Sequence, residues 1–201
     1  MQVTQLEYVD KNKCKVYLDE QFAFVLYKGE LSRHQIELEK ELPPHIRQQI
    51  EQEVLVKRAQ KRVLYLLQRM ARTEAEIRKK LKEGFYSDHV IDQAVAYAKK
   101  FGYINDENYI RFYIEERKQS KSKKEILYKL MAKGVAKDLI IEAMETLYEE
   151  ENEAHTIRTL LRKKKYDPTS ATEKEKQKVY GYLMRKGFSY HEIKKTIMQE
   201  V

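Results

Sequence analysis

The chain repeats one spacing of apolar residues three times, and this repeat limits its possible folds more than any other feature. In each copy, gaps of 4, 10 and 4 positions separate four apolar residues. A gap of four places two side chains on one helix face, and a gap of ten leaves room for a turn between helices. The three sets are Ile77, Leu81, Ile91 and Val95; Ile126, Leu130, Ile140 and Met144; and Val179, Leu183, Ile193 and Ile197.

Turn and cap residues recur in the same frame. Gly84, Gly134 and Gly187 each follow the second helix of a repeat and precede an apolar residue, as in a left-handed C-terminal cap. Gly84 lies three positions after its leucine and the other two lie four after theirs, so the first cap is the least regular. Capping boxes are expected at Thr73–Glu76, Ser122–Glu125, Thr172–Glu175 and Ser189–Glu192.

A third amphipathic segment precedes each helix pair, at roughly 53–70, 106–119 and 151–165. The repeated unit is therefore three helices in about 50 residues, a size typical of helical-repeat proteins. Such units bury their apolar faces against their neighbours and form an elongated, curved array. We expect three-helix repeats at 53–104, 105–150 and 151–201, which makes the protein mainly α.

Residues 1–52 differ from the rest of the chain. Apolar and polar residues alternate in Cys14–Leu18 and again in Phe22–Leu26, which is typical of strands. With a strand in VTQLEYV and a turn at DKNK, we expect a small antiparallel β-meander that ends near Gly29 and leans on the helices. A short helical segment, a break at Pro43-Pro44 and a new helix start complete this region.

The stretch FGYINDENYIRFYIEER at 101–117 is expected to join the first repeat to the second. Glycine after a basic helix end is typical of a helix stop, and Asn-Asp followed by Glu is typical of a helix start. The aromatic residues would supply bulk where one repeat packs on the next. The predicted joint residues are Gly102, Tyr103, Asn105, Asp106, Tyr109 and Phe112.

The charge of the chain favours an anionic partner. The formal net charge is +8 and the sequence pI is about 9.2. Basic residues exceed acidic ones by 12 to 6 in 53–104 and by 12 to 7 in 151–201. Each repeat turns basic near the end of its first helix, and stacked repeats would place these runs along one edge that could follow phosphates. The candidates are Arg69, Arg72, Arg117, Lys118, Lys121, Lys123, Lys124, Arg162, Lys163, Lys164 and Lys165.

Two other interpretations of these basic runs stay open. Cations at helix C-termini stabilise the helix dipole by a few tenths of a kcal/mol without any ligand. They could also meet acidic residues of a partner protein. Tyr113, Tyr128 and Tyr166 lie near the runs and could stack on bases, although packing within or between repeats explains them as well.

Residue patterns for catalysis are missing, so we expect no enzyme and no cofactor. The five histidines are dispersed without an i, i+4 metal pair, and no phosphate-binding glycine loop occurs. Cys14 is single, which excludes an intrachain disulfide. No apolar run is long enough to span a membrane and no secretory signal is visible, so a cytoplasmic protein is expected.

The joint sequence resembles the RecX family of regulatory proteins. The resemblance rests on Gly102-Tyr103-Ile104-Asn105-Asp106-x-x-Tyr109, on Phe112 and Arg117, and on Glu-Ile-x-x-Lys-Leu-x-x-x-Gly at 125–134. Tyr17-Leu18-Asp19-x-x-Phe22-Ala23-Phe24 is similar to the N-terminal extension of the Gram-positive type. Two departures are Glu20, where family members often carry Gly, and the insert KYDPTSATEKEK in the third repeat.

The resemblance implies a modulator of the RecA recombinase that acts in recombination, DNA repair and the SOS response. Family members consist of tandem three-helix units, bind along the groove of the RecA–DNA filament and generally inhibit its ATP hydrolysis and strand exchange. The partners implied are the filament and single- or double-stranded DNA, within the filament or directly, for a protein expected to be monomeric. The alternatives are an independent nucleic-acid-binding protein without sequence specificity and a helical-repeat adaptor for an acidic protein.

Overall fold

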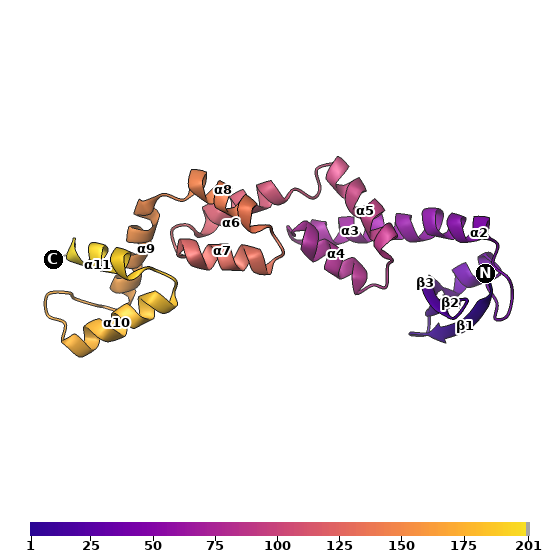
Figure 1. Cartoon of the computed structure of the whole chain (residues 1–201), viewed down its shortest axis with the longest axis horizontal. Helices are drawn as coiled ribbons and strands as arrows, with labels where there is room; N and C mark the ends of the chain where they lie inside the picture. The colour runs from indigo at the N-terminus through magenta and orange to yellow at the C-terminus, as the bar shows by residue number, and fades with distance from the viewer. Residues whose placement is uncertain (200–201) are drawn as a thin grey trace. The chain divides into compact units, whose positions relative to one another are not determined.

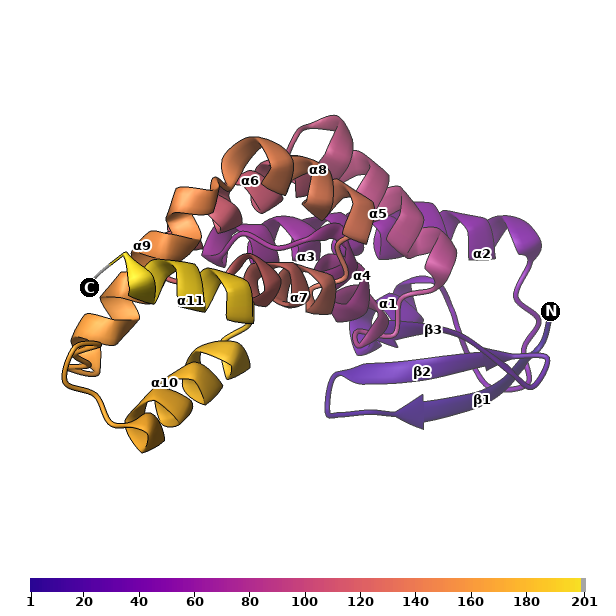
Figure 2. The ribbon, with the colours of Figure 1, turned by 60° about the vertical axis from the view of Figure 1, so that its left-hand side comes forward.

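The computed structural model describes residues 1–199, apart from the side chain of Glu150, and divides the chain into two compact units. The first unit is Met1–Asn105 and the second begins at Asp106. Figure 1 and Figure 2 show the first unit as a small sheet followed by helices, and the second unit as helices throughout. The predicted class, a mainly helical protein with an N-terminal antiparallel sheet, is confirmed.

The sheet has three antiparallel strands in the order β1-β2-β3. Its core face carries the predicted alternating residues, among them Cys14 and Val16, which are fully buried. The β2–β3 turn places Asp19 and Glu20 at φ 47° and 67°, so Glu20 takes a left-handed conformation that glycine adopts more easily. The strands are β1 Val3–Tyr8, β2 Lys13–Leu18 and β3 Gln21–Tyr27.

The first repeat contains a longer first helix than the sequence indicated. A helix start near Pro43-Pro44 is confirmed, with Pro44 in the first turn, where a backbone N–H would have no helical partner and its loss costs nothing. From there the chain stays helical through a π-helical segment into α3, so no break occurs near residue 53. The helices are α1 Lys28–Arg33, α2 Pro44–Gln49, η1 Ile50–Val56, α3 Lys57–Arg69, α4 Glu74–Lys82 and α5 Asp88–Lys100.

The second unit contains two further groups of three helices. Each group has its own buried apolar cluster, and the cluster of the first unit joins the sheet to α3, α4 and α5. Eleven of the twelve residues in the 4-10-4 spacing are buried, and Val179 is partly buried. The helices are α6 Asp106–Arg117, α7 Lys123–Ala132, α8 Lys137–Leu147, α9 Glu150–Lys163, α10 Glu173–Arg185 and α11 Tyr190–Met198.

The second helix of every repeat ends in a Schellman motif with one left-handed residue. Gly134 and Gly187 fill that position at φ 80° and 98°, as predicted. The prediction for Gly84 is wrong, because Phe85 is the left-handed residue, at φ 63°. In each repeat the left-handed residue lies four positions after the buried leucine, and the next residue donates its N–H to that leucine's carbonyl. These bonds are Tyr86 to Leu81 at 3.3 Å, Val135 to Leu130 at 3.2 Å and Phe188 to Leu183 at 3.3 Å.

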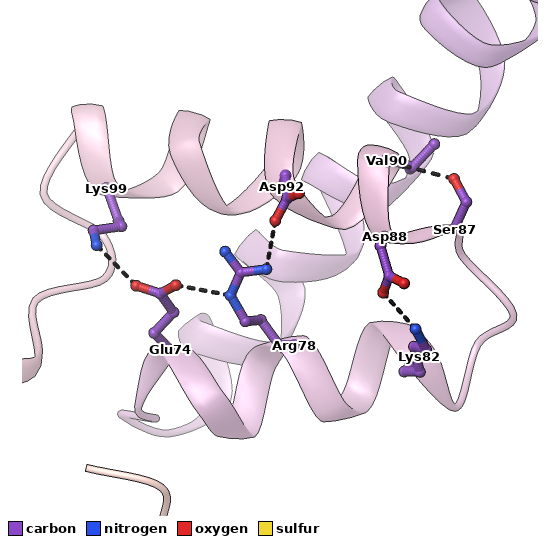
Figure 3. A network of polar contacts seen from close by, with 8 residues as sticks. All are labelled: Glu74, Arg78, Lys82, Ser87, Asp88, Val90, Asp92 and Lys99. Atoms are coloured by element: carbon purple, nitrogen blue, oxygen red, sulfur yellow. Dashed lines mark hydrogen bonds and ion pairs between the residues drawn. The ribbon is translucent and has the colours of Figure 1, made fainter. Parts of the chain in front are cut away.

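Ion pairs join α4 to α5 in the first repeat (Figure 3). Arg78 donates to Glu74 at 2.7 Å and to Asp92 at 2.6 Å, and Lys99 lies 2.8 Å from the other oxygen of Glu74. Each of these cations therefore has a carboxylate partner inside its own repeat. The turn between the helices adds the pair Lys82–Asp88 and the cap of Ser87 on the Val90 N–H.

The predicted capping boxes occur at three of the four helix starts. At Thr73, Thr172 and Ser189 the hydroxyl and the following glutamate both bond the backbone. Ser122 accepts the Glu125 N–H at 3.1 Å, but the return bond from Glu125 is not formed, because its carboxylate pairs with Lys121 instead. The four helix starts are therefore placed correctly and one cap is only half complete.

Replacing Thr73 with alanine should destabilise the first unit by about 1–2 kcal/mol. Thr73 is fully buried, and its hydroxyl accepts the Glu76 N–H at 3.2 Å, so its loss leaves a buried donor without a partner. Urea unfolding followed by circular dichroism measures the change. The matched Thr73→Ser variant keeps the hydroxyl and should recover most of the stability; equal losses in both variants would contradict the capping role.

Candidate nucleic-acid interface

The predicted cations of the first repeat lie at and just after the end of α3. Arg69 is exposed and its guanidinium lies 4.8 Å from the ring centre of Tyr65. Arg72 is half-buried, and its Nε is buried without a hydrogen-bond partner in the described part of the chain. Arg69 is therefore available to a ligand, whereas Arg72 is partly enclosed by its own unit.

The predicted cations of the second repeat fall into two groups. The side chains of Lys123 and Lys124 are exposed and form no ion pair with any described residue. The other three are half-buried and each lies against a nearby carboxylate, which reduces their attraction for an external anion. These pairs are Arg117–Glu116 at 2.6 Å, Lys118–Glu115 at 2.9 Å and Lys121–Glu125 at 2.7 Å.

The predicted cations of the third repeat surround the end of α9. Arg162, Lys163, Lys164 and Lys165 are all exposed. Lys165 is left-handed at φ 51°, which ends the helix and turns the chain toward α10. The ammonium of Lys164 lies 4.8 Å from the ring centre of Tyr182 on α10. Lys164 is therefore exposed and also in contact with the Tyr182 ring.

A concave surface in the second unit gathers cations and tyrosines from two repeats. It has a volume of about 620 Å³ and lies between α7 and the end of α10. Lys124 sits 6.0 Å from the ring centre of Tyr128, and Lys186 sits 6.0 Å from that of Tyr182. We call this surface the basic hollow and define it by Lys124, Tyr128, Lys129, Lys164, Tyr182, Arg185 and Lys186.

The basic hollow is strongly positive. None of its five cations forms an ion pair with a described residue, and the carboxylate of Glu125 at its wall already pairs with Lys121. Tyr128 is 57% exposed, so much of its ring is open to a planar group. Unpaired cations attract phosphates, and aromatic rings stack on bases without regard to sequence. The arrangement therefore fits a single-stranded nucleic-acid segment.

A direct contact between Ser122 and the α10–α11 turn holds the basic hollow together. The fully buried Ser122 hydroxyl donates to the Lys186 carbonyl at 2.7 Å and accepts the Glu125 N–H at 3.1 Å. A Cβ on Gly187 would lie 2.6 Å from the Ser122 oxygen, which is closer than real Cβ atoms come. Glycine at 187 is thus needed for its left-handed conformation and for this approach.

A pair of carboxyl groups, the buried Glu153 and the half-buried Glu192, supports the same junction. Glu153 on α9 is 8% exposed and accepts the Lys123 N–H at 2.9 Å. Burial and a hydrogen bond with Glu192 raise the pKa of Glu153 to about 8, and the same bond lowers the pKa of Glu192. The pair therefore holds a proton on Glu153, which lets two carboxyl groups lie together at a junction between α7, α9 and α11.

The predicted joint residues have different surroundings. Gly102 is left-handed at φ 71°, and α6 begins at Asp106. Tyr109 packs against the apolar cluster of the second repeat. Tyr103 and Phe112 are 52% and 71% exposed. A packing role for these aromatic residues between repeats stays a prediction.

Sequence reasoning missed Lys129, Tyr182, Arg185 and Lys186. These residues lie on α7 and at the end of α10, outside the basic runs that end the first helices. The dipeptide Arg185-Lys186 directly before Gly187 was the available signal, because the turn that follows α10 contacts the second repeat at Ser122.

The described residues contain neither a metal-ligand cluster nor a membrane-spanning helix. No group of three or more metal-ligating side chains comes together among them. None of their helices combines the length and apolar character needed to cross a bilayer. Tandem groups of three helices define the class of helical-repeat proteins.

Comparison with known proteins gives the family. Models of the first, second and third three-helix domains of RecX match residues 59–97, 105–144 and 150–197. The Regulatory protein RecX of Caldanaerobacter subterraneus subsp. tengcongensis is 33% identical over 187 residues, 92% of each chain. That of Clostridium beijerinckii is 29% identical over 192 residues, 93% of this chain and 90% of the relative. The chain belongs to the RecX family, whose members are regulatory proteins and not enzymes.

Two solved structures share the fold. A crystal structure of regulatory protein RecX is 24% identical, with a TM-score of 0.61 over 96% of this chain and 98% of that chain. The crystal structure of RecX from Lactobacillus salivarius is 23% identical, with a TM-score of 0.61 over 72% of this chain and 96% of that chain. At this identity the likeness establishes the architecture.

Gly187→Ala should destabilise the second unit by more than the roughly 1 kcal/mol that a left-handed alanine costs. The added Cβ also pushes against Ser122 and opens the junction beneath the basic hollow. Gly102→Ala is the matched control, because Gly102 is left-handed with no atom within 4 Å of its Cβ position. Hydrogen exchange of each unit measures both losses. Equal losses would show that the Ser122 contact contributes nothing.

The stability of the second unit should fall as pH rises from about 5 to about 8. The folded unit keeps the Glu153 proton up to its raised pKa of about 8, whereas the unfolded chain releases it near the ordinary value of 4.5. Stability from this group is fully present below pH 4.5 and decreases by about 1 kcal/mol per pH unit within the window. Urea unfolding at several pH values measures the slope. Glu153→Gln should flatten it, and an unchanged slope in that variant would contradict the assignment.

Proposed function

We propose that this protein binds the RecA–DNA filament and lowers its ATP hydrolysis and strand exchange. Two observations support the proposal: membership of the RecX family, and the basic hollow in the second unit. The hollow carries it, because five cations without carboxylate partners in the described chain create a local positive potential that attracts an external anion. The phosphates of the nucleoprotein filament are such an anion.

The mechanism we propose is steric and electrostatic. Lys124, Lys164 and Lys186 approach phosphates of the bound strand, and Tyr128 offers a ring on which a base can stack. Repeats held in the filament groove in this way hinder the subunit movements that accompany ATP turnover. Arg69 provides a further exposed cation in the first unit.

The proposal treats the protein as a monomer that acts in the cytoplasm, where RecA filaments form. All residues of the basic hollow come from one chain, so the site needs no second copy. The exposed ring of Tyr128 also favours a second candidate function, direct binding of single-stranded nucleic acid without RecA. The two functions differ in whether the recombinase is required.

Charge reversal in the basic hollow should weaken inhibition of RecA. The measurement is single-stranded-DNA-dependent ATP hydrolysis by the cognate recombinase, titrated with this protein. For Lys124→Glu combined with Lys186→Glu, we expect the half-inhibitory concentration to rise about tenfold or more, because each reversal replaces an attraction by a repulsion. Charge reversal at Arg117 or Lys121 should weaken inhibition less, since both side chains are already paired with carboxylates.

The control is Lys137→Glu combined with Lys194→Glu. Both lysines are exposed on the second unit and lie outside the basic hollow, so the net charge changes equally. An equal loss of inhibition in the two double variants would show that the effect depends on overall charge and not on the basic hollow. Unchanged hydrolysis, together with binding of bare DNA by the unmodified protein, would replace the filament proposal with direct nucleic-acid binding.

A further inference from the structure

The two edges of the N-terminal sheet are treated differently. The start of the β1 edge is covered by the chain itself: the Val3 N–H donates to the Lys40 carbonyl at 2.9 Å, and the Glu39 N–H donates to the Val3 carbonyl at 2.8 Å. A bridge between Gln2 and Glu41 extends this cover. Exposed strand edges pair readily with other chains, and these bonds prevent such pairing at the start of β1.

The β3 edge has no backbone partner in the described chain. β3 pairs only with β2, and its contacts on the other side come from side chains. Arg58 Nη1 donates to the Val25 carbonyl at 3.4 Å, which is long for a hydrogen bond, and the Tyr27 N–H donates to Glu30 at 2.7 Å. In an antiparallel strand the N–H and C=O of one residue point the same way, so the Val25 N–H also faces away from β2.

The open edge lies in a cleft. The cleft has a volume of about 660 Å³ and runs between β3, the η1–α3 helix and the turn from α4 to α5. Phe24, Val25 and Leu55 give it an apolar lining, and all three side chains are buried. We call it the edge cleft. One wall of the edge cleft is the unpaired backbone edge of β3, and the other wall is the η1–α3 helix.

The edge cleft is rich in cations. Its two carboxylates are already engaged, since Glu83 pairs with Lys80 at 2.7 Å and Glu51 lies 3.2 Å from His89. Lys61 and Arg62 are exposed and form no ion pair with a described residue. The cations that line it are Lys13, Arg47, Arg58, Lys61, Arg62 and Lys80.

We propose that the edge cleft binds an extended acidic segment of a partner protein, which adds to β3 as a fourth strand. Main-chain bonds to the Val25 N–H and C=O supply affinity, and carboxylates that reach Lys61 and Arg62 supply selectivity. The Arg58 guanidinium leaves the Val25 carbonyl and keeps its 3.0 Å contact with Glu30. This site is separate from the basic hollow and does not depend on it.

The chemistry of the edge cleft favours this occupant over two others. A second copy of the chain would bring an equally basic edge against this one, and the like charges would repel. A nucleic-acid strand would satisfy the cations, but it has no alternating N–H and C=O groups to pair with β3. An acidic peptide satisfies the cations and the open backbone together.

The test uses the full chain and a fluorescent peptide of about seven residues that alternates Val and Glu, the length of a typical strand. Binding is followed by anisotropy, and exchange of the Val25 N–H is followed by NMR. We expect binding, slower exchange at Val25, and affinity about tenfold weaker for Lys61→Glu combined with Arg62→Glu. The control, Lys57→Glu combined with Lys79→Glu, changes exposed cations outside the edge cleft and should lose less than twofold.

Several results would overturn the proposal. Equal binding of a matched Val–Lys peptide would show that the cations of the edge cleft do not select acidic peptides. Binding without slower exchange at Val25 would exclude strand addition. Binding of a fluorescent oligothymidylate of about 15 nucleotides that the combined Lys61→Glu and Arg62→Glu variant weakens, with no binding of the peptide, would assign the site to nucleic acid. Concentration-dependent dimers whose formation protects Val25 would assign it to a second copy.

Discussion

One backbone constraint sets the path of the chain in all three repeats: a left-handed residue four positions after a buried leucine. At that point the second helix stops, two of its free carbonyls are satisfied, and the chain is turned into the third helix. The leucine packs against the residue after the turn, which ties the stop to the apolar cluster. In the third repeat the same turn also meets Ser122, so a local conformation helps join two repeats.

The distribution of ion pairs separates structural cations from available ones. Arg78 and Lys99 bridge α4 and α5 through Glu74, so their charges stabilise the first repeat. Lys124 and Lys186 have no such partners in the described chain and lie around exposed aromatic surface. Net charge in a sequence counts both kinds alike. Only the pairing shows which part of the positive charge can act on a ligand.

The sequence contained enough to predict the elements but not the site. The 4-10-4 spacing and the caps are local signals, and they placed residues such as Ile77, Ile126 and Ile193 correctly in the core. The basic hollow depends on a contact between Ser122 and Lys186, 64 positions apart, which no local pattern encodes. The error at Gly84 has a different cause. Phenylalanine takes the left-handed position there although glycine is adjacent, because the count from the leucine fixes the position.

The exposed β3 edge could not be foreseen from alternation alone. Alternating residues predict a strand, but they do not say which of its neighbours is missing. The segment after α1 returns to cover β1 and leaves β3 open, and this choice follows from long-range pairing at Val3. Lys61 and Arg62 can be recognised as candidate ligand-binding residues only when that edge is known to lie beside them.

Phe85 gives the three turns unequal dynamics. A non-glycine residue in the left-handed region raises the free energy of the folded turn by roughly 1 kcal/mol. Local opening of the first turn releases this strain, whereas the two glycine turns have no such strain to release. That favours its open form over those of the other turns by several-fold at equilibrium. Phe85 is also part of the wall of the edge cleft, where it contacts Phe22 and Lys15. A ligand seated in the edge cleft would therefore lie against the turn that carries this backbone strain.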